Sequence, residues 1–129
     1  MSKVYTYQYD ANYDPAMPVV DIRIGRAMAE VLLALTSQVD SGADATMIPI
    51  RYLQQIRARR SRKKWMRGTT GGRILVDLYP ISLQIGPLTQ AHLEVVGNTQ
   101  NDEVIVGRDV LNHLTVTLNG PGSSVEVAV

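Results

Sequence analysis

The sequence predicts a mostly β domain, and three observations support this fold class. The chain contains no Phe and one Trp, and Val, Ile and Leu supply most of the apolar content, which favours strands over a helical bundle. Short apolar runs alternate with turns that contain Gly or Pro along most of the chain, as expected for strands joined by tight connections. With 129 residues, 45% of them apolar, the chain is long enough for one domain with a small core.

The first part of the chain contains a polar segment and a predicted hairpin. Residues 1–16 are polar and carry tyrosines at the period-two spacing that places side chains on one face of a strand: Tyr5, Tyr7 and Tyr9. We interpret this stripe as one face of an ordinary strand that could contribute to a dimer interface. Residues 19–24 alternate as a strand up to Gly25, and residues 31–35 form an apolar run that leads towards Asp40. These two segments predict a hairpin.

The middle of the chain predicts a short helix and a second hairpin. Pro49 suits the first turn of a helix that extends to about Ile56, where Leu53 and Ile56 share a face and the arginines point outward. Residues 68–72, Gly-Thr-Thr-Gly-Gly, form a turn between residues 64–67 and 74–78, which predicts a glycine-tipped hairpin.

The last part of the chain predicts further short strands. The expected elements are a strand at 81–85, a Gly86-Pro87 turn, a strand at 91–96, a loop at 97–103, a buried strand at 104–106, a short helix at 109–114 and a final hairpin of 115–119 with 125–129. No internal repeat or linker is evident.

Basic residues are concentrated in one segment. Seven of the 13 Lys and Arg residues fall at 57–67, which contains no acidic residue. Elsewhere six basic residues face 12 acidic ones, a net charge of −6, so attraction between the two regions is expected. The basic segment could contact nucleic-acid phosphates, but the overall net charge is +1 and few aromatic residues lie nearby. A solvated loop is therefore the favoured interpretation, and we do not expect nucleic acid as a partner.

The sequence carries no mark of export or membrane insertion. Cysteine is absent, so there is no disulfide framework and no thiolate metal site. No stretch approaches the roughly 20 apolar residues of a membrane-spanning helix, and the N-terminus lacks a basic-then-apolar export signal. We therefore expect a soluble, cytoplasmic protein without a membrane partner.

The most informative motif is Asp40-Ser41-Gly42-Ala43-Asp44. An aspartate at the end of an apolar strand, followed by a hydroxyl residue, glycine and alanine, resembles the signature of aspartic proteases. Their chemistry needs two carboxylates that face each other over one water and share one proton, because two like charges a few ångströms apart cannot both be ionised. The motif occurs once, so the sequence predicts a two-fold symmetric dimer.

Two further motifs extend this resemblance in chain order. The hairpin over residues 66–76 resembles a protease flap, and Ile105-Val106-Gly107-Arg108-Asp109 resembles a hydrophobic-hydrophobic-Gly-Arg-Asn/Asp signature. Over about residues 18–119 the chain thus resembles the retropepsin-type aspartic proteases, single-domain homodimers of retroviruses and of some cellular relatives. The resemblance implies an all-β fold, a retropepsin-like closed β-barrel or sandwich with one or two short helices, active as a symmetric homodimer.

The resemblance also implies a domain organisation. Residues 1–129 are expected to form a single domain, with an N-terminal extension at about 1–16, a flap hairpin at about 64–78 and a C-terminal hairpin at about 115–129. Because retroviral forms end near Asn119, their terminal dimer sheet is expected to be rebuilt here. The initiator Met and the extensions favour a freestanding cellular protein, with a maturation product as the alternative.

Roles around the first motif follow from the same resemblance. Asp40 from each subunit would form the catalytic dyad, one carboxylate activating water and the other, protonated, polarising the scissile carbonyl. Ser41 would hydrogen-bond across the two-fold axis, and Gly42 would leave room for the substrate backbone. Asp44 would accept hydrogen bonds from that backbone and pair with the guanidinium fork of Arg108. The supporting residues of the active site are thus Ser41, Gly42, Ala43, Asp44 and Arg108.

Substrate contacts are expected from the hairpin tip and from two strands. Gly68, Thr69 and Thr70 would close over an extended peptide that binds as an added strand. Ile105 would line a pocket wall. Gln38, two residues before Asp40 and on the same strand face, replaces an apolar residue usual in the family, which predicts a polar subsite. The two tip threonines replace a glycine and an apolar residue common in retroviral flaps, so substrate specificity is not carried over.

Other site chemistries have less support. No Gly-Lys-Ser/Thr follows the glycines at 68–72, so a plain hairpin turn is preferred to a phosphate cradle. His92 and His113 lack ligand spacing, and no Gly-x-Ser-x-Gly elbow occurs, so we expect no metal, no other cofactor and no serine-hydrolase site.

Two functions follow from these observations. The sequence favours an aspartic endopeptidase that cleaves extended peptide or protein substrates at acidic to near-neutral pH. The alternative is a catalytically silent or gated retropepsin-fold module that binds peptides or regulates a partner.

Overall fold

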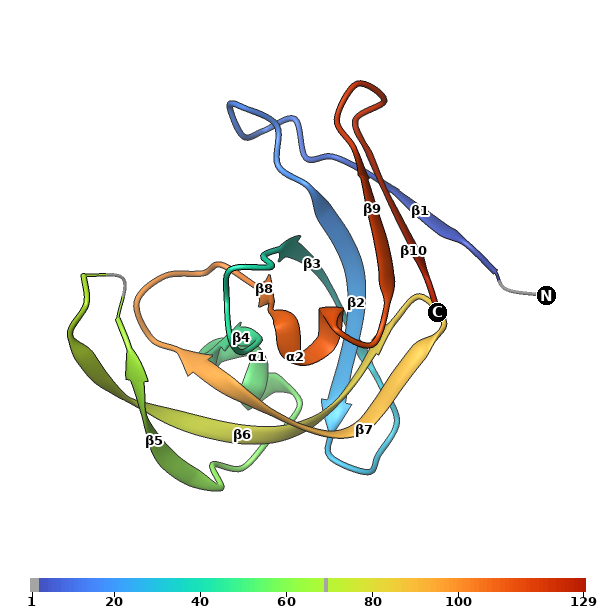
Figure 1. The fold of residues 1–129 in the computed structure, drawn as a ribbon. Helices are drawn as coiled ribbons and strands as arrows, with labels where there is room; N and C mark the ends of the chain where they lie inside the picture. Colours follow the sequence, from blue (N-terminus) through green and yellow to red (C-terminus); the bar gives the residue numbers. More distant parts are fainter. Residues whose placement is uncertain (1–2, 69) are drawn as a thin grey trace.

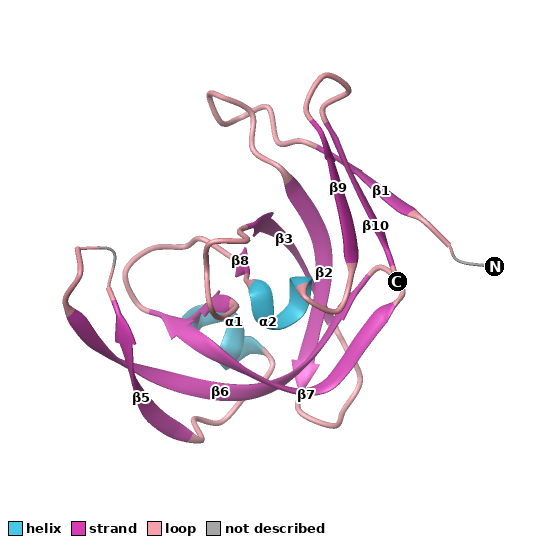
Figure 2. Cartoon of the chain, in the orientation of Figure 1, coloured by secondary structure: helices cyan, strands magenta, loops and turns pink. Residues whose placement is uncertain are grey.

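The computed structural model describes residues 3–68 and 70–129, and strands make up most of their regular structure (Figures 1 and 2). The strands are β1 (Tyr5–Gln8), β2 (Val19–Arg26), β3 (Leu33–Val39), β4 (Met47–Pro49), β5 (Arg62–Arg67), β6 (Arg73–Ile85), β7 (Leu88–Asn98), β8 (Ile105–Val106), β9 (Thr115–Asn119) and β10 (Ser124–Ala128). The helices α1 (Ile50–Gln55) and α2 (Arg108–Leu111) are short. Within the described residues, no helix has the length and apolar character needed to cross a membrane.

The seven-stranded sheet closes into a barrel. Its strand order is β2-β3-β8-β4-β7-β6-β5, and β2 also pairs with β6. Because this extra pairing joins the first strand of the order to the last but one, β5 is left outside the closed ring and extends from it as a hairpin with β6. The predicted all-β fold with a closed barrel and short helices is confirmed.

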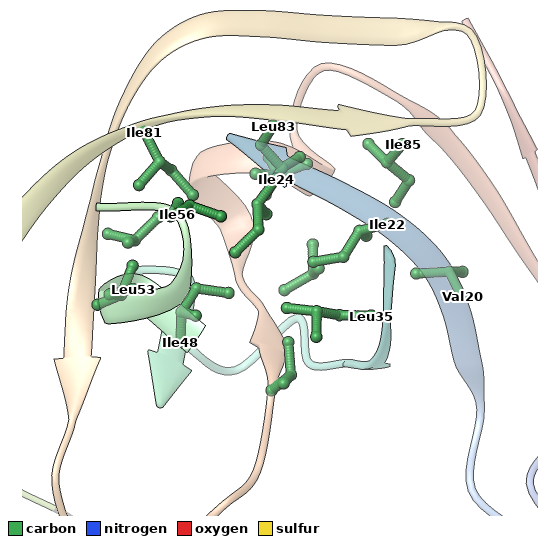
Figure 3. Packing of buried hydrophobic residues seen from close by; sticks show 14 of the residues in the cluster. Val20, Ile22, Ile24, Leu35, Ile48, Leu53, Ile56, Ile81, Leu83 and Ile85 are labelled. Atoms are coloured by element: carbon green, nitrogen blue, oxygen red, sulfur yellow. The ribbon is translucent and has the colours of Figure 1, made fainter. Parts of the chain in front are cut away.

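Alternating residues on the barrel strands fill its core. Along β2, Val20, Ile22 and Ile24 are at most 1% exposed, whereas Asp21 and Arg23 between them face solvent. Figure 3 shows the inward residues of β2 packed against a matching set from β6, α1 and the residue that follows α1: Ile81, Leu83, Ile85, Leu53 and Ile56. Each buried aliphatic side chain stabilises the fold by about 1.5–3 kcal/mol, so this cluster holds the barrel that carries the loops described below.

A separate three-stranded sheet, in the order β1-β10-β9, combines the two ends of the chain. Figure 1 shows it extending from the barrel at the upper right. The tyrosine stripe is confirmed as a strand face for Tyr5 and Tyr7, which are half-buried in β1, whereas Tyr9 follows the strand; all three pack on the core. Burial raises the pKa of Tyr7, and the charge of Asp21 adds to this effect.

Several predicted boundaries differ from the structure. The strands expected at 74–78 and 81–85 are one strand, β6, because it continues through Pro80, where its neighbour on one edge changes from β5 to β2. Strand β4 was not predicted, and its parallel pairing with the end of β7 extends β7 into the expected loop at 97–103. Helix α2 begins at Arg108 and ends at Leu111. Up to Leu114 the expected helix continues only as turns, in which the His113 N–H donates to the Val110 carbonyl and the Leu114 N–H to the Leu111 carbonyl.

The basic segment is only partly a loop. Its second half is the exposed strand β5, so the solvated-loop interpretation is wrong for residues 62–67. The expected attraction to acidic residues is confirmed by a set of ion pairs: Arg60–Asp77 at 3.6 Å, Lys63–Asp77 at 3.9 Å and Arg62–Glu94 at 3.1 Å. These pairs link β5 to β6 and β7.

Candidate active site

Asp40 follows β3 directly and begins the loop that leads to β4, which we call the aspartate loop (residues 40–46). The Asp40 backbone N–H donates to the Val106 carbonyl of β8 at 3.0 Å, and the Ala43 N–H donates to the Asp40 carbonyl at 3.2 Å. The Asp40 Oδ1 accepts a hydrogen bond from the Gly42 N–H at 2.9 Å. The carboxylate is therefore held in a tight turn and is only partly buried.

Arg108, at the start of α2, bonds to the aspartate loop on both sides of Gly42. Its Nη1 donates to the Ser41 carbonyl at 2.7 Å, and its Nη2 forms an ion pair with Asp44. Its backbone N–H donates to the Ala43 carbonyl at 2.9 Å. The predicted pairing of Asp44 with Arg108 is confirmed, and the contact with the Ser41 carbonyl was not foreseen. One guanidinium thus fixes the loop on both sides of Gly42.

Asp109 and Thr46 form a second connection, to which the sequence analysis assigned no role. The two carboxylate oxygens of Asp109 accept from the Thr46 N–H at 3.1 and 2.9 Å, and Oδ1 also accepts from the Thr46 hydroxyl at 2.7 Å. The Thr46 Oγ1 in turn accepts from the Gly107 N–H at 3.2 Å. Thr46 is fully buried, and a buried polar group needs such partners. No local pattern in the sequence indicates this pairing, which joins residues 63 positions apart.

Gly107 allows the backbone of the β8–α2 corner to touch the aspartate loop. A Cβ at this position would lie 2.7 Å from the Ala45 carbonyl carbon, 2.8 Å from its oxygen and 2.9 Å from the Ala43 oxygen. Real Cβ atoms do not approach backbone this closely, so only glycine fits. The Gly-Arg-Asp motif therefore acts as a unit that holds the loop through all three of its residues.

A cleft of about 310 Å³ separates the aspartate loop from the β5–β6 hairpin. One side is formed by the loop and α2, including Asp44, Ala45 and Asp109, and the other by β5, including Lys64 and Met66. At the hairpin tip, the Gly71 N–H donates to the Gly68 carbonyl at 3.1 Å, and Gly71 has a φ of +89°. The predicted tip residue Thr70 is exposed, whereas Thr69 lies outside the described residues.

Gln38 and Ile105 are brought together at another place. They lie opposite each other in the parallel pairing of β3 with β8. The Gln38 Nε2 donates to the Tyr13 hydroxyl at 3.2 Å, and Gln38 lines a pocket of about 260 Å³ with Tyr13 and Glu103. The structure therefore does not place Gln38 in the cleft that Asp44 borders, and the substrate-binding roles of Gln38 and Ile105 stay predictions.

Candidate metal ligands do not converge within residues 3–68 and 70–129, where no group of three or more His, Cys, Asp or Glu side chains could hold an ion. His92 and His113 are exposed and lie on different elements.

Comparisons with known proteins agree with this geometry. The family model of the retroviral aspartyl protease matches residues 15–119. A crystal structure of a retropepsin-like aspartic protease from Rickettsia conorii superposes with a TM-score of 0.66 at 12% sequence identity, covering 99% of this chain and 94% of that one. The protease of EIAV in complex with an inhibitor gives a TM-score of 0.56 at 19% identity, covering 75% and 86%. No curated protein sequence matches significantly.

Proposed function

Because the chain belongs to the retroviral aspartyl protease family, we propose that it is an aspartic endopeptidase that hydrolyses peptide bonds in extended polypeptides. The observation that carries the proposal is the setting of Asp40, a partly exposed carboxylate in a loop that Arg108 and Asp109 hold from one side. Catalytic groups must be kept in one geometry by their surroundings. The aspartate loop meets this requirement.

The proposed reaction uses Asp40 from two subunits. One carboxylate is ionised and takes a proton from a water as its oxygen attacks the scissile carbonyl carbon, while the other carboxyl donates its proton to the carbonyl oxygen. The resulting diol collapses when the carboxyl that took the proton from water gives it to the amide nitrogen and a diol hydroxyl returns a proton to the other carboxylate, as the bond between carbon and nitrogen breaks. No covalent intermediate forms. Since one proton must be shared by the pair, activity is expected at acidic to near-neutral pH.

A second copy of the chain is needed because the sequence holds one such motif. Strand β9, one of the two edge strands of the terminal sheet, supports this homodimer, since a free strand edge can pair with another chain. Leu118 of β9 lies opposite Val125 and so shares its sheet face, yet Leu118 is 54% exposed while Val125 is fully buried. A partner copy would cover this leucine.

The cleft between the aspartate loop and the β5–β6 hairpin is the proposed substrate site. An extended peptide would bind there as an added strand, with Asp44 accepting from its backbone and the hairpin tip at Gly68 and Thr70 closing over it. Ser41 would then bond across the two-fold axis, and Gln38 and Ile105 would line a neighbouring subsite.

Residues 1–129 are proposed to act as one domain in the cytoplasm. The barrel and the terminal sheet share one hydrophobic cluster, which supports the single domain, and the cysteine-free sequence is compatible with a reducing compartment.

The test is cleavage of a diverse peptide library between pH 4 and 8. The wild type should cleave the peptides. Asp40→Asn replaces both carboxylates of the dyad, one in each subunit, and should lower kcat/KM by at least about 1000-fold. Asp14→Asn, the same change on an exposed surface loop, should retain full activity. Cleavage that persists in Asp40→Asn would refute the mechanism. A folded dimer that binds peptides without cleaving them would instead favour a peptide-binding module.

Dimerisation has its own test. Sedimentation of the wild type should show a dimer at micromolar concentration, and Leu118→Lys should weaken it about tenfold or more, because a charge replaces an apolar contact. Thr117→Lys places the same charge on the opposite sheet face and should have less effect. A wild type that stays monomeric while active would contradict the shared dyad.

A further inference from the structure

Strand pairing decides which side chains of the β5–β6 hairpin face the cleft. Arg62 pairs with Leu78 and Lys64 with Val76, so these four side chains share one face of the hairpin. Leu78 is only 4% exposed and borders the cleft together with Lys64, which makes this the inner face. Trp65, the next residue along β5, also borders the cleft, but it is 55% exposed and strand alternation assigns its side chain to the outer face.

Each carboxylate that borders the cleft already bonds to a protein donor: Asp44 to Arg108, Asp109 to Thr46, and Glu94 to Arg62 and Ser61. Arg62, a cation of the inner face, is therefore occupied by Glu94, with bonds of 3.2 Å from Nε and 3.1 Å from Nη2. These pairs leave no carboxylate of the cleft wall without a partner.

Lys64 differs from its neighbours because it forms no ion pair within the described residues. Arg67 also borders the cleft without such a pair, but strand alternation assigns it to the outer face, opposite Arg73. Among the described residues, Lys64 is thus the inner-face cation that forms no ion pair.

Beside its charged groups, the cleft also offers apolar surface to a ligand. Met66 and Leu78 continue the hairpin side of the cleft, and Ala45 and Val96 contribute from the aspartate loop and β7. A ligand side chain that fits here needs an apolar stem to lie along these residues and an anionic tip to reach the ammonium group. Among the side chains of a peptide, glutamate has this combination, because its two methylene groups precede the carboxylate.

We infer that Lys64 is a specificity-determining residue that selects a glutamate side chain in the substrate. The inference rests on the proposed function, since it assumes that the peptide lies in this cleft. Lys64 does not touch the reacting atoms, so its effect is on which peptides bind. Asp44 belongs to the same loop as Asp40 and borders this cleft, so the selected glutamate lies in the part of the substrate site that Asp44 borders.

Cleavage of paired peptides tests the inference in the active protein. A library that is cleaved by the wild type should be enriched in glutamate at one position, and the glutamate peptide should exceed its glutamine counterpart about tenfold in kcat/KM, as for one charge-assisted hydrogen bond. Lys64→Gln should bring this ratio close to one, and Lys64→Glu should favour a lysine peptide. Lys63→Gln removes the same charge from the outer face and should leave the ratio unchanged.

A binding measurement separates this inference from the proposed function. The Asp40→Asn protein is panned against the same library, and the recovered peptide is compared with its glutamine variant by fluorescence anisotropy. A preference of about tenfold for glutamate that disappears in Asp40→Asn/Lys64→Gln supports the role of Lys64 even if the wild type cleaves nothing. Equal affinity for the two peptides, a preference that survives loss of Lys64, or no bound peptide at all would overturn it.

Discussion

The aspartate loop and the β5–β6 hairpin face each other across one cleft but are held in different ways. The loop is bonded to the β8–α2 corner through the backbone and side chain of Arg108 and through Asp109, and Gly107 allows direct backbone contact. The hairpin leaves the barrel, its outer residue Trp65 is 55% exposed, and its ion pairs lie on the surface.

This difference matches what each region is proposed to do. A dyad works only if its carboxylates stay in one geometry, and the loop carries several buried or half-buried bonds that resist displacement. A cover over the substrate must open to let the peptide enter, and segments with few buried contacts open at low cost in free energy. Three of the four predictions below compare a change in the loop or its support with a matched change in the hairpin, and the other tests the hairpin's outer face.

The largest difference in the loss of stability is expected between alanine substitutions of two glycines. Gly107→Ala forces a Cβ within 2.7 Å of the Ala45 backbone and should lower the free energy of unfolding by about 3 kcal/mol, because neither backbone can yield easily. Gly72→Ala in the hairpin meets nothing within 4 Å and should change stability by less than about 1 kcal/mol. Urea denaturation followed by far-UV circular dichroism measures both. Similar losses would show that the two regions are equally tightly packed.

A smaller difference in the loss of stability is expected between alanine substitutions of two aspartates. Asp109→Ala removes the acceptors of the Thr46 N–H and hydroxyl and leaves buried donors unpaired, which should cost about 2–3 kcal/mol. Asp77→Ala removes only the surface pairs of the hairpin with Arg60 and Lys63 and should cost less than about 1 kcal/mol. The same denaturation experiment distinguishes them. A costly Asp77→Ala would mean that the hairpin depends on its surface charges.

The parts of the fold that the sequence predicted have local signals. The hairpin of β2 and β3 follows from alternation, and that of β5 and β6 from the glycines between them. Strand β4 was missed because three residues are too few to show a period, and β6 was divided because Pro80 usually ends a strand. These errors concern elements whose extent is decided by neighbouring strands.

The candidate site likewise has contacts that local motifs indicate and contacts that depend on distant parts of the chain. The ion pair of Asp44 with Arg108 was expected because a known family has both residues in recognisable motifs. The bonds of Asp109 to Thr46 join residues 63 positions apart, and neither residue has a local pattern that indicates the other. Likewise, the Lys64 side chain faces inward because Lys64 pairs with Val76. The sequence predicted the hairpin but not which residues of its two strands lie opposite each other.

A milder test concerns the outer face of the hairpin. Trp65→Ala removes a largely exposed ring whose centroid lies 5.5 Å from the Arg73 guanidinium. The expected loss of stability is about 0.5–1 kcal/mol. The glutamate preference assigned to Lys64 should not change, because strand alternation places the Trp65 side chain on the opposite face of β5 from Lys64. Denaturation and the paired-peptide assay measure the two effects. A lost preference would indicate that the outer face also contacts the substrate.

The smallest expected effect is at the base of the hairpin, where Glu94 of β7 accepts hydrogen bonds from Arg62 and Ser61. The bond from Arg62, followed by that from Ser61, holds the pKa of Glu94 below its ordinary value. A depressed carboxyl pKa stabilises the fold above the unfolded-state value and loses that contribution as the pH falls through the folded-state value. Glu94→Gln should therefore cost about 0.5 kcal/mol at pH 7, since the pair is exposed to solvent.

The difference in the free energy of unfolding between the wild type and Glu94→Gln should disappear as the pH falls below about 4. Denaturation at pH 7, 5 and 3 measures it. Asp109→Asn is the matched change on the loop side. It should lower the stability at pH 7 more than Glu94→Gln does, because its partner Thr46 is fully buried. A Glu94→Gln cost as large as that of Asp109→Asn would mean that the hairpin base is as firmly fixed as the aspartate loop. The opening assigned to the hairpin would then have to occur beyond this base, closer to its tip.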